Sequence, residues 1–166
     1  ERLCAAAAVC PPLDLRVSGD ALARGFNRVY TRHFLATLRP KALAKLVRWP
    51  GLFDRERMLR ADTLRAFDDL YTAPVHGFRD ADDYWRRASS RPWLKHVALP
   101  TLLLTAANDP FVPPDAVPGA AELSPAVHHA HLRTGGHVGF VSGRWPGHLD
   151  WLPTTVLDFV GRAHPQ

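Results

Sequence analysis

Three short segments of strand length stand out in the pattern of hydrophobic and polar positions along the 166-residue chain. Residues 3–10 (LCAAAAVC) form a continuous apolar run that Pro11-Pro12 ends. Its length and lack of alternation favour a strand buried on both faces, although four consecutive alanines leave a helix as the alternative. Residues 99–106 (LPTLLLTA) predict a second strand of the same kind, and residues 127–132 predict a third strand.

Between the first two strands the apolar positions change to a helical period. Leu22, Phe26, Val29 and His33 follow one another at intervals of four, three and four, which predicts one face of a helix over residues 20–38. A proline inside a helix removes a backbone hydrogen bond, so Pro40 is expected to end this helix. Further helices are expected over residues 41–47, 55–71, 80–88 (with Asp80 as N-cap) and 148–163.

This alternation of strands and helices predicts an α/β fold with a mostly parallel sheet flanked by helices. We expect residues 1–13 and 97–166 to form the α/β core. Residues 14–96 are expected to form a mostly helical insertion, a cap or lid over the carboxyl ends of the strands.

The composition is that of a globular domain, since 46% of the residues are hydrophobic and 22% are charged. No apolar run reaches the length that spans a membrane, and no signal peptide pattern follows Glu1. Cys4 and Cys10 show no spacing typical of a metal site or a disulfide framework, which favours a reducing cytoplasm.

The net charge of +5 is unevenly distributed, because basic residues gather between Arg24 and Arg65. Arg24, Arg28 and Arg32 recur every four residues, and like charges at that spacing repel weakly on a helix. Either solvent or an anionic partner, such as a membrane surface, is therefore expected opposite them. Nucleic acid is not expected as a partner, because no nucleic-acid motif with interleaved aromatic residues accompanies the charge.

An acid and a histidine follow consecutive predicted strands. Asp109 lies in the turn N-D-P after residues 99–106, and His137 lies in T-G-G-H-V-G-F after residues 127–132. Each residue alone has a structural explanation, as a turn former or a loop histidine. Together they fit two members of a nucleophilic triad, because reactive groups of open α/β sheets gather at the carboxyl ends of strands.

A second group of histidines invites a metal interpretation, which the pattern does not favour. In a strand His129 and His131 share one face while His128 points the other way, and no further ligand stands at a useful distance. Neither a metal nor a cofactor is expected.

Longer motifs support the same chemistry by resemblance. The chain resembles the YheT-like branch of the α/β-hydrolases through the segments GFNRVY (25–30), FDDLYTAPVHGFRDADDYW (67–85), NDPF (108–111) and GGHVGF (135–140). The resemblance implies the C-terminal part of an α/β-hydrolase fold and a cofactor-independent serine hydrolase of carboxylic esters, esterase-like or lipase-like. It also implies Asp109 as the triad acid and His137 as the triad base.

The nucleophile of such a triad has no counterpart in the sequence. In α/β-hydrolases the chain order is nucleophile, acid and histidine, with the serine in a G-x-S-x-G turn between a strand and a helix. Cys10 follows a predicted strand, but Pro11-Pro12 cannot form that turn. We therefore expect the serine, with the rest of the family's N-terminal half, to lie outside this sequence. The alternative is a non-catalytic binding module or degenerate relative whose basic cap is the working surface. None of the serines stands between glycines at this spacing: Ser18, Ser89, Ser90, Ser124 and Ser142.

Overall fold

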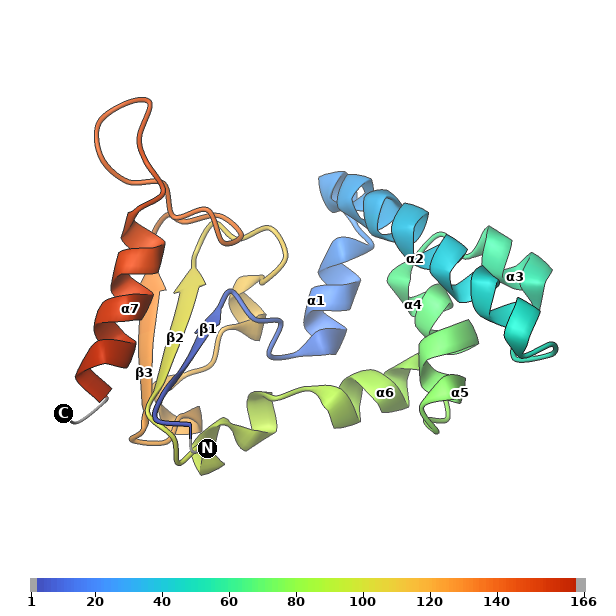
Figure 1. Cartoon of the computed structure of the whole chain (residues 1–166), viewed down its shortest axis with the longest axis horizontal. Helices are drawn as coiled ribbons and strands as arrows, with labels where there is room; N and C mark the ends of the chain where they lie inside the picture. The colour runs from blue at the N-terminus through green and yellow to red at the C-terminus, as the bar shows by residue number, and fades with distance from the viewer. Residues whose placement is uncertain (1–2, 164–166) are drawn as a thin grey trace. The chain divides into compact units, whose positions relative to one another are not determined.

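A computed structural model describes residues 3–163 and contains a parallel three-stranded sheet in the order β1-β2-β3 (Figure 1). The strands are β1 (Ala6–Val9), β2 (Thr101–Ala106) and β3 (Val127–Leu132). Ala6 lies opposite Thr101, which lies opposite Val127 on its other side. The predicted α/β class and all three predicted strands are thereby confirmed, and the helical alternative for the alanine run is wrong.

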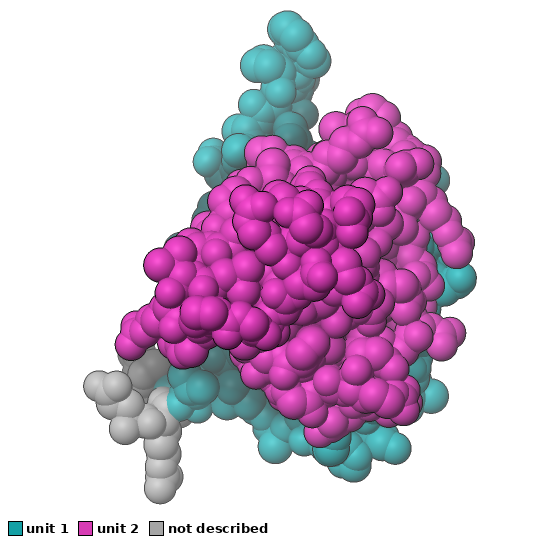
Figure 2. Space-filling view, turned by 90° about the vertical axis from the view of Figure 1, so that its right-hand side faces the viewer, with its two compact units in different colours: residues 1–13, 90–166 teal, residues 14–89 magenta. Residues whose placement is uncertain are grey.

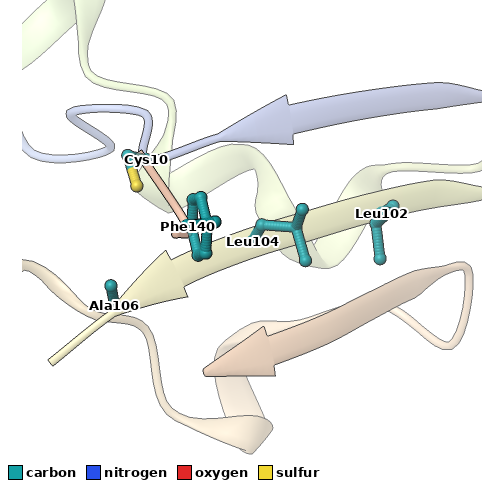
Figure 3. Packing of buried hydrophobic residues seen from close by; sticks show 5 residues of the cluster. All are labelled: Cys10, Leu102, Leu104, Ala106 and Phe140. Atoms are coloured by element: carbon teal, nitrogen blue, oxygen red, sulfur yellow. The ribbon is translucent and has the colours of Figure 1, made fainter. Parts of the chain in front are cut away.

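The central strand β2 carries the core of the sheet on both faces. Leu102, Leu104 and Ala106 pack with Cys10 and Phe140 on one face (Figure 3). Helix α7 (Trp151–Ala163) covers this cluster through Trp151, Leu152, Val156 and Phe159. On the other face Leu103 packs with Leu13, Leu94 and Val127. Burying each leucine side chain contributes about 1.5–3 kcal/mol, so β2 is the main anchor of the sheet.

Strand β1 departs from the prediction of a strand buried on both faces. Ala7 is exposed, and only Cys10 at the end of the run is fully buried. The reason is topological, because β1 has one strand neighbour within residues 3–163 and so lies at the edge of the sheet described.

The chain divides into two compact units, which Figure 2 shows in separate colours. Unit 1 comprises the residues up to Leu13 and those from Ser90 onward, and unit 2 comprises Asp14–Ser89. Unit 2 ends at Ser89, whereas the helical insertion expected from the sequence ends at residue 96. Unit 1 also contains the short 3-10 helices η3 (Arg91–His96), η4 (Pro114–Ala116) and η5 (Ala120–Glu122).

Unit 2 is built from helices and turns around one apolar cluster of Leu35, Ala42, Met58 and Phe67. None of the helices within residues 3–163 is long and apolar enough to cross a membrane. The elements of this unit are α1 (Leu15–Leu22), η1 (Gly25–Asn27), α2 (Arg28–Arg48), α3 (Arg55–Arg60), α4 (Leu64–Phe67), the π-helical turn η2 (Asp68–Thr72), α5 (Ala73–Val75) and α6 (Ala81–Ala88).

Helix α2 contradicts two predictions. It runs through Pro40 without a break, because burial of Leu35 before the proline and Ala42 after it offsets the lost hydrogen bond. The predicted apolar face is also wrong, since Phe26 is 75% exposed and Val29 is 50% exposed. The buried side instead carries Thr31, Leu35 and Ala42. Leu35 and Ala42 belong to the apolar cluster, whereas the Thr31 hydroxyl donates to the Leu22 carbonyl at 2.6 Å.

The remaining helix predictions hold in part. The helix expected over residues 55–71 is interrupted before α4, where the Thr63 side chain caps a new helix by accepting from the Ala66 N–H at 3.1 Å. Asp80 caps α6 as predicted and accepts from the Asp83 N–H at 2.8 Å. Helix α7 begins later than residue 148, because His148 pairs with Ser142 in an isolated antiparallel bridge.

Candidate active site

Asp109 and His137 come from the two loops that leave the carboxyl ends of β2 and β3. The Asp109 N–H donates to the Ala106 carbonyl at 3.1 Å, which folds the acid back over the end of its strand. Because β2 and β3 are parallel neighbours, their carboxyl ends bring the two loops to one edge of the sheet.

The acid and the histidine are in direct contact. His137 Nδ1 lies 3.0 Å from Asp109 Oδ2, and the Asp109 side chain is 1% exposed while that of His137 is 34% exposed. The other carboxylate oxygen, Oδ1, accepts from the Phe111 N–H at 2.8 Å. The Phe111 ring lies against the imidazole with a centroid separation of 4.5 Å. The carboxylate and ring are therefore held in fixed orientation, with Nε2 on the side of the imidazole away from Asp109.

Asn108 joins the two loops through its side chain. Its Oδ1 accepts from the backbone N–H groups of both Gly135 and Gly136, each at 2.9 Å. The residue before the acid thus anchors the loop that carries the histidine. The sequence pattern indicated Asn108 only as a turn former. The signal that could have predicted its role is the combination of an acceptor side chain directly before the acid and two backbone N–H donors, Gly135 and Gly136, directly before the histidine.

The glycines of this loop serve two different purposes. Gly136 has φ +59°, in the left-handed region that favours glycine. Gly135 instead allows close packing, because a Cβ there would lie 2.6 Å from Phe140 Cε1 and 3.0 Å from Ala106 Cβ. Phe140 is 3% exposed and stacks on Trp151, so it is firmly held. The absence of a side chain at Gly135 therefore lets the loop that carries His137 pack directly against Phe140 and Ala106.

Cys10 forms a third side of the site, which the sequence did not reveal. It follows β1 with φ +48°, is 1% exposed and lies with Sγ 3.6 Å from the Gly136 carbonyl oxygen. Burial raises the pKa of the Cys10 thiol to about 11, and the neighbouring Asp109 contributes to this rise. A thiol held protonated in this way is a poor nucleophile at neutral pH.

The three histidines of β3 lie as the strand pattern predicts. His129 Nε2 and His131 Nδ1 both lie 2.8 Å from Thr105 Oγ1, whereas the His128 ring packs against Phe159. Burial lowers the pKa of His129, and the neighbouring His131 lowers it further. Contacts with β2 therefore hold His129 and His131, and a contact with α7 holds His128.

A parallel sheet flanked by helices, with an acid–histidine contact at its carboxyl edge, defines this chain as an α/β protein. A scan of protein-family models and a search of solved structures found no match. Among curated proteins, "Putative esterase YheT" of Escherichia coli is 36% identical over 158 residues, which cover 94% of this chain and 46% of the relative. "Putative esterase slr0264" of Synechocystis is 31% identical over 178 residues, covering 92% of this chain and 46% of the relative. "Phospholipase ABHD3" of Mus musculus is 32% identical over 143 residues, covering 85% of this chain and 35% of the relative.

The chain is therefore homologous over most of its length to YheT-like esterases and ABHD3 phospholipases of the α/β-hydrolase family. The resemblance that the sequence motifs indicated is thereby confirmed. The chain spans less than half the length of each of these three relatives.

Proposed function

We propose that this chain supplies the acid and the base of a serine hydrolase that acts on carboxylic esters. The observation that carries the proposal is the 3.0 Å contact between His137 Nδ1 and the buried Asp109 carboxylate. The names of the relatives, two esterases and a phospholipase, support ester substrates. The nucleophilic serine comes, in this proposal, from a segment outside the present sequence.

The proposed chemistry depends on the orientation of the pair. Asp109 accepts from Nδ1–H and so leaves the Nε2 lone pair of His137 free to take the serine proton as Oγ attacks the acyl carbon. The tetrahedral intermediate collapses when the imidazolium returns this proton to the leaving alcohol oxygen. Water then hydrolyses the acyl-enzyme by the same route, with His137 as base and acid in turn. Throughout, the Asp109 charge stabilises the imidazolium that forms in each half-reaction.

Replacing either member of the pair tests the assignment in the polypeptide that carries both this chain and its serine. Asp109→Asn should lower kcat about 10⁴-fold, because the amide favours the wrong histidine tautomer. His137→Ala should abolish ester turnover with little loss of folding. Asp150→Asn is a matched control, since the Asp150 side chain is 85% exposed. Turnover that survives in His137→Ala would refute the proposal.

A non-catalytic binding module is the competing function. A serine-directed phosphonate probe separates the two, because it should label the polypeptide that contains the serine and leave this chain alone unlabelled. Absence of labelling, together with no turnover of short- and long-chain esters, would favour the binding module.

We also propose that unit 2 acts as a cap and that its basic surface contacts an anionic membrane. The compartment proposed for the protein is a reducing cytoplasm. Arg24, Arg28 and Arg32 are exposed, and the apolar Phe26 and Val29 are exposed among them. Arginines combined with exposed apolar side chains suit the surface of an anionic bilayer. Binding to vesicles containing phosphatidylserine, compared with pure phosphatidylcholine, should weaken in Arg28→Glu; equal binding to both vesicles would contradict the lipid contact.

A further inference from the structure

Three chemically different ligand groups meet at the carboxyl edge of the sheet. Cys10 follows β1, Asp109 follows β2 and His137 follows β3. The thiol sulfur, a carboxylate oxygen and a ring nitrogen of these residues all lie within 4.8 Å of one another. The hydrolase mechanism uses the acid and the histidine but gives the buried thiol no part.

The arrangement is within about 1 Å of the dimensions of a tetrahedral zinc site. Zinc bonds of about 2.0 Å to nitrogen or oxygen and about 2.3 Å to sulfur place neighbouring ligand atoms about 3.3–3.6 Å apart. His137 Nδ1 and Asp109 Oδ2 are already at 3.0 Å. A shift of about 1 Å brings the sulfur, at most 4.8 Å away, to the same separation.

The charges and ligand types favour zinc over harder cations. A thiolate and a carboxylate together neutralise Zn²⁺, so the cluster, in which Cys10 and Asp109 are buried, carries no net charge. Thiolate and imidazole select zinc, whereas Mg²⁺ and Ca²⁺ prefer oxygen ligands. Since His137 is one-third exposed, its side of the cluster leaves room for water as fourth ligand.

We propose that Cys10, Asp109 and His137 form a zinc site that switches the hydrolase off. Zn²⁺ releases the thiol proton to solvent and binds Nδ1, the nitrogen that faces Asp109. The proton of the neutral imidazole then resides on Nε2, which becomes a donor and cannot accept the serine proton. Binding of zinc depends on this chain alone, whereas the inhibitory effect rests on the function proposed above.

Metal binding is tested on the purified chain with Co²⁺ as a spectroscopic probe and Zn²⁺ as competitor. Co²⁺ should give a thiolate charge-transfer band in the near ultraviolet that Zn²⁺ removes. Cys10→Ser should abolish the band and weaken Zn²⁺ binding at least tenfold, as should His137→Ala. Cys4→Ser is the matched control, since Cys4 is the other cysteine of the sequence and is exposed. A band that persists in Cys10→Ser, or is lost in Cys4→Ser, would overturn the site.

Circular dichroism establishes whether each variant is folded. If Cys10→Ser does not fold, Asp109→Asn provides a second test of zinc binding. This variant keeps a side chain of the same size but removes a charged ligand, so Zn²⁺ should bind at least tenfold more weakly. Unchanged binding would also overturn the site.

Inhibition is tested by ester turnover in the polypeptide that carries the serine, with each variant compared with its own metal-free rate. Zn²⁺ should inhibit the unmodified protein and Cys4→Ser, Mg²⁺ should not, and a chelator should restore turnover. Cys10→Ser should need at least tenfold more Zn²⁺ for the same inhibition. Zinc that binds but leaves turnover unchanged or raises it would overturn the switch. Zinc binding together with turnover that survives in His137→Ala would instead show that the hydrolase proposal has failed.

Discussion

Gly135→Ala is the substitution that tests most directly how the histidine loop is supported. The added Cβ would lie 2.6 Å and 2.7 Å from two Phe140 ring carbons and 3.0 Å from Ala106 Cβ, all shorter than van der Waals contact. Phe140 cannot move away easily, because it is 3% exposed and its ring stacks on Trp151 at 5.4 Å. The loop itself must therefore shift.

The expected loss of stability comes from overpacking rather than from backbone strain. One extra methyl group in a filled core typically costs about 1–3 kcal/mol, and Gly135→Ala should lower the free energy of unfolding by that amount. The shift also moves His137, two residues later, relative to Asp109. A displacement of about 1 Å in such a pair can cost about 10²-fold in rate, so ester turnover should fall further than stability alone requires.

Urea denaturation of the protein, followed by circular dichroism, measures the loss of stability. Gly161→Ala in α7 is the matched control, because a Cβ there meets nothing within 4 Å and alanine favours the helix by about 1 kcal/mol. Phe140→Leu removes part of the clashing ring, so the double variant with Gly135→Ala should lose less stability than the two single losses added together. Additive losses, or a Gly135→Ala variant as stable as the unmodified protein, would refute the packing argument.

Three further predictions concern stability. Leu104→Ala should lower the free energy of unfolding by about 2–5 kcal/mol, since Leu104 is 0% exposed, whereas Leu157→Ala at a 69% exposed position should change it by less than about 0.5 kcal/mol. Pro40→Ala should raise the melting temperature, because alanine restores a hydrogen bond inside the continuous α2 and is favoured there by up to about 3 kcal/mol; a lower melting temperature would contradict this. Arg91, which donates to both oxygens of Glu122, lowers the pKa of that carboxyl from 4.5 to about 2. Glu122→Gln should therefore lower the free energy of unfolding by about 1 kcal/mol at pH 7, a value discounted for the exposure of the ion pair. The difference from the unmodified protein should disappear as the pH falls from about 4.5 to about 2. A difference that does not depend on pH would refute the contribution of the ion pair.

The strands and the acid–histidine contact were predictable because they depend on short-range rules. Residues 101–106 are an apolar run of strand length and residues 127–132 are a second segment of that length, and parallel neighbours place the loops after them at one edge of the sheet. From these two rules alone, Asp109 and His137 were expected to meet, and they lie 3.0 Å apart.

The helical unit was less predictable because its local signals conflict with its packing. Pro40 signals a helix end, yet apolar contacts on either side keep α2 continuous. Phe26 and Val29 fit a helical period but lie on the exposed side, because periodicity does not say which face meets the cluster. Cys10 and Asn108 were missed for a similar reason, since their contacts depend on where loops from distant segments pass.

The double hydrogen bond to Asn108 ties the loop after β3 to the loop after β2. The amide protons of Gly135 and Gly136 are protected by Oδ1 only while the loop after β3 remains docked on the loop after β2. Opening of this contact exposes both amides to water and separates the imidazole from its carboxylate in the same event. The exchange rates of these two amide protons with deuterium therefore measure, without any substrate, how often the contact between Asp109 and His137 opens.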